Sequence, residues 1–100
     1  MILTEDQICI VTDYFRDTPV VAVYLFGSYA RGDADSRSDI DLLVQTDVEN
    51  RCWTDLRRYK RELADRLKLP IDLFEQHKIF KYALADIFGE RVLIYSRTLN

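Results

Sequence analysis

The stretch LFGSYARGDADSRSDIDLLV, from Leu25 to Val44, carries the most information in this chain of 100 residues. It joins two apolar segments through a turn that begins at Gly27-Ser28, and it places two carboxylates, Asp39 and Asp41, at the start of the second segment. Side chains two residues apart on a strand point to the same face. If the second segment is a strand, Asp39 and Asp41 share one face, and the stretch predicts a place where metal ions and phosphate groups are held.

The rest of the sequence predicts strands that alternate with helices. Thr4 and Gln7 fit a capping box at the start of a helix that ends before Pro19. Apolar runs predict strands, and apolar residues at helical spacing predict helices with a C-cap at Gly89. The strands are 20–26, 40–45, 71–74 and 92–95, and the later helices are 28–31, 56–67 and 79–88. This alternation predicts one α/β domain over residues 1–100, with a sheet covered by helices.

The composition is that of a folded globular chain, with 48% hydrophobic and 12% aromatic residues. The net charge of −3 argues against direct nucleic-acid binding by the chain as a whole. Cys9 and Cys52 form no C-x-x-C pair, which argues against a disulfide scaffold or a zinc site. The sequence shows no secretory signal and no membrane-spanning apolar run, so we expect a cytoplasmic protein.

Asp39 and Asp41 are the first candidates for catalysis. Two like charges this close weaken a strand unless something neutralises them, and Mg²⁺ prefers carboxylate oxygens, water and phosphates. Asp72 is the third candidate because it is the acid within the apolar run 69–74. If its strand lies beside the second one, three carboxylates converge on a metal site. The structural alternatives are a turn residue for Asp39 and a strand-end carboxylate for Asp72.

Gly27, Ser28 and Arg31 are the candidates for phosphate binding. Gly27 permits a sharp turn and a close phosphate, and a helix that starts at Ser28 directs N–H groups toward that phosphate. The Ser28 hydroxyl adds a donor, and Arg31 adds a planar cation, unless Arg31 pairs with Asp33 or Asp35. Neither a P-loop nor a G-x-G-x-x-G pattern occurs, and the structural alternative is an ordinary strand-to-helix turn.

Two further features have competing interpretations. The basic run that contains Arg57, Arg58, Lys60 and Arg61 fits a solvated helix face, with docking of an acidic partner or RNA as the alternative. Tyr29 lies inside the glycine turn, and we expect it to be partly exposed beside a bound nucleotide.

The spacing of the motif resembles the signature of the nucleotidyltransferase superfamily, G-S followed by ten residues and D-x-D. Gly27, Ser28, Asp39 and Asp41 meet it with the spacing intact. The text GSYARGDADSRSDIDLLV is similar to the minimal nucleotidyltransferases of the DNA polymerase beta-like superfamily, small antitoxins paired with HEPN-domain ribonuclease toxins. The resemblance implies a nucleotidyltransferase fold, a small mixed sheet of core strand order 1-2-3 plus a short edge strand, flanked by helices. Asp72 falls where this family places its third carboxylate.

The resemblance also implies a Mg²⁺-dependent transferase that moves AMP from ATP onto a tyrosine hydroxyl of a partner HEPN toxin, in a hetero-oligomeric complex, and so silences it. Asp39, Asp41 and Asp72 would hold two Mg²⁺ ions, and Asp72 would help to activate the acceptor hydroxyl. Ser28 would hold the terminal phosphates, and Gly27 would let them approach. Relatives that act on antibiotics or RNA carry an added substrate domain that this sequence does not show, which favours a protein acceptor.

Two alternatives compete with this hypothesis. One is a non-catalytic antitoxin that neutralises its partner by binding alone. The presence of all three expected acids favours an active site over a degenerate one. The other is a nucleotidyltransferase that acts on RNA or a small molecule, against which the acidic net charge argues.

Overall fold

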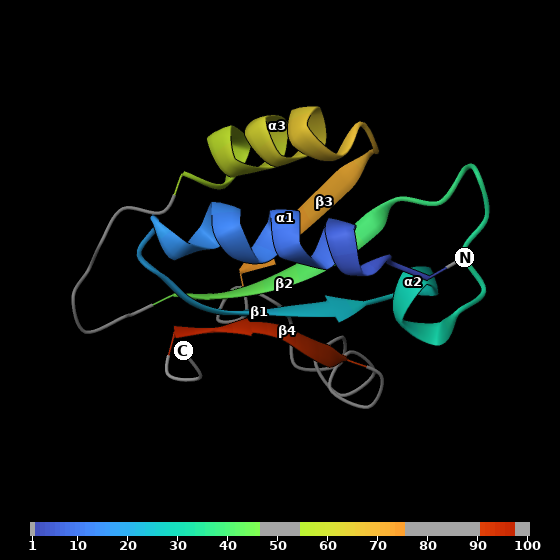
Figure 1. Cartoon of the computed structure of the whole chain (residues 1–100), viewed down its shortest axis with the longest axis horizontal. Helices are drawn as coiled ribbons and strands as arrows, with labels where there is room; N and C mark the ends of the chain where they lie inside the picture. The colour runs from blue at the N-terminus through green and yellow to red at the C-terminus, as the bar shows by residue number, and fades with distance from the viewer. Residues whose placement is uncertain (1, 47–54, 76–90, 98–100) are drawn as a thin grey trace.

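The computed structural model describes residues 2–46, 55–75 and 91–97 (Figure 1). The elements are, in chain order, α1 (Glu5–Arg16), β1 (Val20–Phe26), α2 (Ser28–Arg31), β2 (Ile40–Thr46), α3 (Leu56–Leu67), β3 (Ile71–Glu75) and β4 (Val92–Ser96). The capping box at Thr4 is confirmed, and β2, β3 and β4 each run one residue beyond their predicted ends. The helix expected at 79–88 and its cap at Gly89 lie outside the described residues. No described helix is long and apolar enough to span a membrane.

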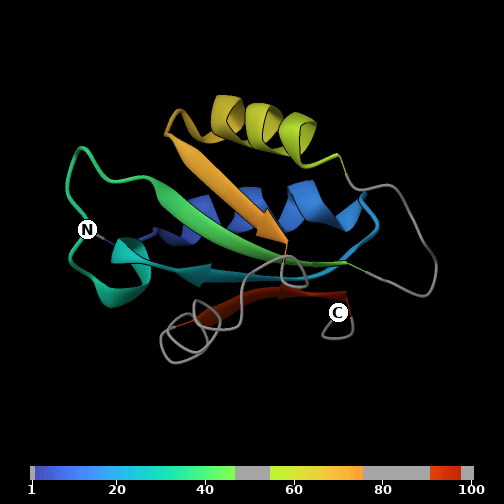
Figure 2. The ribbon, with the colours of Figure 1, turned by 180° about the vertical axis from the view of Figure 1, so that it is seen from behind.

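The four strands form one mixed sheet in the order β3-β2-β1-β4 (Figure 2). β1 pairs antiparallel with β2 and with β4, whereas β2 and β3 are parallel. The predicted core order, with the second strand between the first and the third, is confirmed, and β4 is the short edge strand beside β1. Parallel neighbours need a crossover connection, and the connection between β2 and β3 contains α3.

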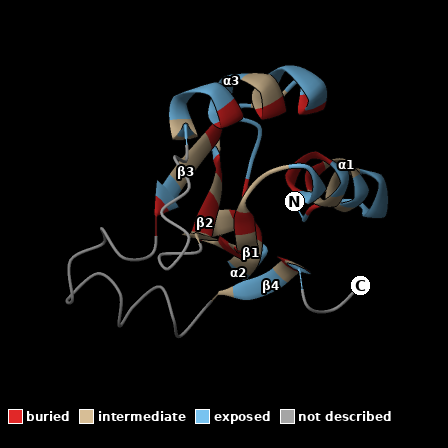
Figure 3. Cartoon of the chain, turned by 90° about the vertical axis from the view of Figure 1, so that its left-hand side faces the viewer, coloured by how far each residue is buried: buried red, intermediate tan, exposed pale blue. Residues whose placement is uncertain are grey.

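Helices α1 and α3 cover one face of the sheet, and the buried residues gather between them and the strands (Figure 3). Ile40, Leu42 and Val44 of β2 are fully buried in this core. Because side chains alternate along a strand, Asp41 between them points to the opposite face. The apolar residues of β2 therefore decide on which side of the sheet the acidic residues lie.

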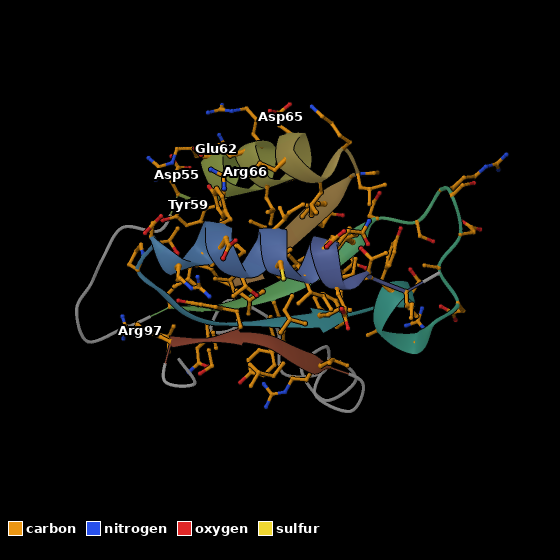
Figure 4. The ribbon with its side chains drawn as sticks, in the orientation of Figure 1. Asp55, Tyr59, Glu62, Asp65, Arg66 and Arg97 are labelled. Carbon is orange, nitrogen blue, oxygen red and sulfur yellow. The ribbon has the colours of Figure 1, made fainter. Side chains whose placement is uncertain are left out.

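A cluster of rings joins α1 to α3. Tyr14, Phe15 and Tyr59 pack edge to face, with ring centroids 5.2–6.1 Å apart. The Arg66 guanidinium lies 4.9 Å from the centroid of the Tyr14 ring, and the Tyr14 hydroxyl donates a hydrogen bond of 3.3 Å to Glu62 Oε2. Figure 4 shows Tyr59, Glu62 and Arg66 on the side of α3 turned toward α1. These contacts set the rotation of α3, and with it the direction of its basic residues.

The Tyr14 contact predicts a pH dependence of stability. Burial, together with the neighbouring Glu62 carboxylate, raises the pKa of the Tyr14 hydroxyl from 10.0 to about 12. The folded state holds this proton more tightly than the unfolded chain, so its contribution is complete below pH 10 and is lost as the pH rises toward 12.

We expect Tyr14→Phe to be less stable than wild type by ~1 kcal/mol at neutral pH, and the difference to shrink between pH 10 and pH 12. Urea unfolding of both proteins across this pH range measures the difference in stability. The other tyrosines are common to both proteins, so their titration cancels in the difference. A difference that stays constant with pH would contradict the assignment to Tyr14.

Candidate active site

The candidate site lies at the end of the sheet where β1 ends and where β2 and β3 begin. Phe26, the last residue of β1, pairs with Asp41, and Asp41 pairs with Asp72 of β3. Paired residues on neighbouring strands point to the same face. The carboxylates of Asp41 and Asp72 are therefore neighbours on the face away from α1 and α3, and the predicted adjacency of the second and third strands is confirmed.

Asp39 is the residue directly before β2, whose first residue, Ile40, is the one that the sequence predicted. Directly after it, the Ile40 N–H donates a 3.0 Å hydrogen bond to the Pro70 carbonyl, which begins the pairing of β2 with β3. Within the described ranges, no three His, Cys, Asp or Glu side chains stand close enough to form a metal cluster. The three acids lie at one end of the sheet with Asp41 and Asp72 adjacent, but the described side chains do not form the predicted cluster of three carboxylates.

Asp72 has a basic partner that the sequence analysis did not predict. Because β3 is an edge strand, Lys60 of α3 reaches Asp72 at the edge of the sheet: Lys60 Nζ lies 3.0 Å from Asp72 Oδ1, and the two side chains are 52% and 37% exposed. Lys60 partly neutralises the negative charge that Asp72 and its strand neighbour Asp41 place side by side. In the sequence, Lys60 is one of several basic residues of a helix. It can be recognised as the partner of Asp72 only once α3 is known to lie against β3.

Gly27 brings the turn into direct contact with the Asp41 carboxylate. Its backbone, with φ 77° and ψ −154°, occupies a region open essentially to glycine alone. A Cβ at this position would collide with Asp41 Oδ2 and would lie 3.3 Å from Asp41 Cγ. Residue 27 must therefore be glycine on two independent grounds, and the G-S and D-x-D parts of the motif meet in space.

The turn after Gly27 is a single turn of helix, as predicted. The N–H groups of Ala30 and Arg31 donate to the Gly27 carbonyl at 3.1 and 3.0 Å, and α2 ends at Gly32 in the left-handed conformation. Tyr29 is buried as part of the main core, so the prediction of a partly exposed ring was wrong. Because the turn is short, its one large apolar side chain packs inward and attaches α2 to the sheet.

Arg31 contacts the acid that the sequence analysis kept as an alternative partner. Arg31 Nε lies 3.2 Å from Asp33 Oδ2, and both side chains are largely exposed. An exposed pair of this kind is worth only ~0–1 kcal/mol. The pair with Asp33 therefore contributes little to the stability of the exposed end of α2.

A groove of about 350 Å³ opens between α3 and the start of β3, with Asp39 and Asp72 in its wall. Its remaining lining comes from α3 and from the residues that lead into β3, namely Arg57, Lys60, Arg61, Ala64, Pro70 and Ile71. Gly27 and Ser28 do not line it. The acids therefore lie between a glycine turn on the β1 side and a cationic groove on the α3 side, an arrangement able to hold a phosphorylated ligand next to a second reactant.

Comparison with known proteins agrees with this geometry. The family model "Polymerase beta, Nucleotidyltransferase" matches residues 10–100. The chain belongs to this nucleotidyltransferase family. A relative from Methanocaldococcus jannaschii, named "Putative protein adenylyltransferase", is 37% identical over 68 residues, which are 68% of this chain and 72% of the relative.

Solved structures share the fold of this nucleotidyltransferase. A chain of a toxin–antitoxin crystal structure with AMP-PNP superposes with a TM-score of 0.75 at 22% identity, over 97% of this chain and 77% of that one. A chain from the structure of tri-AMPylated Shewanella oneidensis HEPN toxin in complex with MNT antitoxin superposes with a TM-score of 0.70 at 18% identity. The superposition covers 97% of this chain and 76% of that one. The structure of a "putative minimal nucleotidyltransferase" superposes with a TM-score of 0.71 at 28% identity, over 87% of each chain. At identities below 25%, the first two establish the fold alone.

Two aromatic residues of the nucleotidyltransferase site escaped the sequence analysis. Phe26 and Phe74 lie on the same sheet face as Asp41 and Asp72, with ring centroids 5.5 Å apart. Phe74 is 40% exposed. The period-two pattern of the strands already places each ring on the acidic face. The sequence placed both residues in apolar strands but did not distinguish their face, because an apolar residue on either face of a sheet gives the same sequence signal.

Proposed function

We propose that this nucleotidyltransferase transfers AMP from ATP onto a tyrosine hydroxyl of a partner HEPN-domain toxin and thereby neutralises it. Membership of the family and a relative named as a protein adenylyltransferase support the transfer of AMP to protein. The shared fold with a complex of a tri-AMPylated HEPN toxin supports the partner. The observation that carries the proposal is the contact of Gly27 with Asp41, because it sets the glycine turn directly against a pair of adjacent carboxylates.

Asp39, Asp41 and Asp72 are the residues that would hold Mg²⁺. Their donors are carboxylate oxygens, which hard divalent cations prefer, and Asp41 and Asp72 are strand neighbours. Because residue 27 has no Cβ, the Asp41 carboxylate lies directly against the backbone of the turn. When bound, Mg²⁺ supplies positive charge against the attacking and leaving oxygens of a phosphoryl transfer.

The residues of the chain itself position the reactants in this proposal. Gly27 lets the phosphates approach the backbone, and the Ser28 hydroxyl donates to a terminal phosphate oxygen. Arg31 reaches a phosphate only by leaving Asp33, which makes its role secondary. Asp72 lines the groove and accepts the proton of the acceptor hydroxyl. The hydroxyl oxygen of the acceptor then bonds to the α-phosphorus. Pyrophosphate leaves on the opposite side.

A mass measurement tests the proposal. The protein is incubated with ATP, Mg²⁺ and a candidate HEPN-domain partner from the same genome, and the mass of the intact partner is recorded. We expect the partner to gain one or more AMP units, and chelation of Mg²⁺ to prevent the gain. An unchanged mass in a stable complex of the two proteins would contradict the enzymatic proposal and favour neutralisation by binding.

A further inference from the structure

Two arginines of the groove differ from the other basic residues of α3 in their contacts with the described residues. On α3, Arg58 pairs with Glu62 at 3.4 Å, Arg66 lies over the Tyr14 ring, and Lys60 pairs with Asp72. Arg57 and Arg61 take part in no ion pair or ring contact within the described part of the chain, and both line the groove. Since Lys60 and Asp72 offset each other, the groove presents two guanidinium groups that form no ion pair with a described residue, in the same wall as Asp39.

The position of these arginines relative to the candidate active site decides which reactant they face. In the sheet order, Asp72 on β3 and Asp41 on β2 separate the groove from Gly27, which follows β1. In phosphoryl transfer the attacking and leaving oxygens lie roughly in line on opposite sides of the phosphorus. If the phosphates occupy the turn at Gly27, the acceptor enters from the groove.

From this geometry we infer that Arg57 and Arg61 bind an acidic, extended segment of the acceptor protein next to its reactive hydroxyl. This inference rests on the proposed function for the existence of a protein acceptor. The two arginines are four residues apart on one helix face, about 6 Å along the axis. Alternate residues of an extended chain lie about 6.6 Å apart on one side. Carboxylates at alternate positions of such a segment match both guanidinium groups, each of which can donate two parallel hydrogen bonds to a carboxylate.

The size and composition of the groove favour a peptide over RNA. A volume of about 350 Å³ admits a few side chains, and the described lining contains no aromatic ring on which a base could stack. Single-stranded nucleic acids need a basic track several nucleotides long together with such rings. The two arginines form a short cationic site within a chain of net charge −3.

The test compares matched double variants for peptide binding. The probe is a fluorescein-labelled tyrosine peptide with glutamates at alternate positions, titrated at low salt and followed by fluorescence anisotropy. We expect Arg57→Gln/Arg61→Gln to weaken binding about tenfold, equal to ~1.4 kcal/mol. Arg16→Gln/Lys68→Gln removes the same charge from exposed surface pairs outside the groove and should change binding less than about twofold. Arg57→Lys/Arg61→Lys should restore part of the affinity, since charge remains without the planar fork.

Controls separate this inference from the proposed function. A peptide with glutamine in place of glutamate should bind weakly to wild type and respond to neither double variant. Equal losses in the two glutamine variants, or no loss in either, would overturn the inference. Tighter binding of an oligouridylate that depends on Arg57 and Arg61 would overturn it in favour of RNA. AMP transfer to the partner is measured separately, so intact transfer without acidic-peptide binding refutes the inference alone, and peptide binding without transfer refutes the proposed function alone.

Discussion

Replacement of both Asp39 and Asp41 by asparagine should abolish AMP transfer while the protein stays folded. Asparagine has nearly the same shape as aspartate but lacks the negative charge that holds Mg²⁺. We expect the rate to fall by about a thousandfold or more, because charge neutralisation at the phosphorus is the main contribution of such a site. Stability should be unchanged or slightly higher, since the repulsion between neighbouring Asp41 and Asp72 is relieved.

The rate of AMP addition to the partner, followed by intact mass, measures this effect, and circular dichroism measures folding. Asp65→Asn is the matched control. Asp65 is exposed and pairs with Lys68 at 3.5 Å, and Figure 4 shows it on the outer side of α3. This variant should transfer AMP at the wild-type rate. Full activity of the Asp39→Asn/Asp41→Asn protein would remove the carboxylates from the mechanism and with them the proposed function.

Gly27→Ala should impair both stability and transfer through a single added methyl group. The backbone at Gly27 lies in a region that costs other residues about 1–3 kcal/mol, and the new Cβ collides with the Asp41 carboxylate. Either the turn or Asp41 must shift. A displacement of about 1 Å at a reacting centre costs about a hundredfold in rate. Urea unfolding and the same transfer assay report the two losses.

Gly32→Ala separates backbone strain from the collision. Gly32 also has a positive φ of 84°, but an added Cβ there would meet no atom within 4 Å. We expect a cost of only ~1–2 kcal/mol from the left-handed conformation, with transfer close to wild type once the protein is folded. If the two alanine variants lose activity to the same degree, the contact between Gly27 and Asp41 has no special part in the site.

Much of the fold could be predicted because it depends on local patterns. The capping box at Thr4, the apolar run that becomes β1 and the turn at Gly27 are each encoded within a few neighbouring residues. The family resemblance then supplied the strand order, which no local pattern contains. The ends of β2, β3 and β4 were each short by one residue, because a strand ends where its pairing partner ends.

The errors and omissions at the site come from contacts between residues that are distant in the sequence. Tyr29 was expected near the surface but is buried, because the short turn packs against the sheet. Lys60 appeared only as one member of a basic run, and its pairing with Asp72 depends on where α3 docks. That docking is set by Tyr14, Phe15 and Tyr59, whose contact joins helices more than forty residues apart.

By itself, then, the sequence determined the elements, the spacing of Gly27-Ser28 from Asp39 and Asp41, and the candidacy of Asp72, since these follow from side-chain chemistry and short-range periodicity. Only the tertiary structure decided that the Gly27 turn touches Asp41, that Asp72 pairs with Lys60, and that Arg57 and Arg61 face a groove beside them. Each of these contacts joins residues on different strands or helices. Their distance depends on strand register and helix rotation, which the packing of the whole core sets.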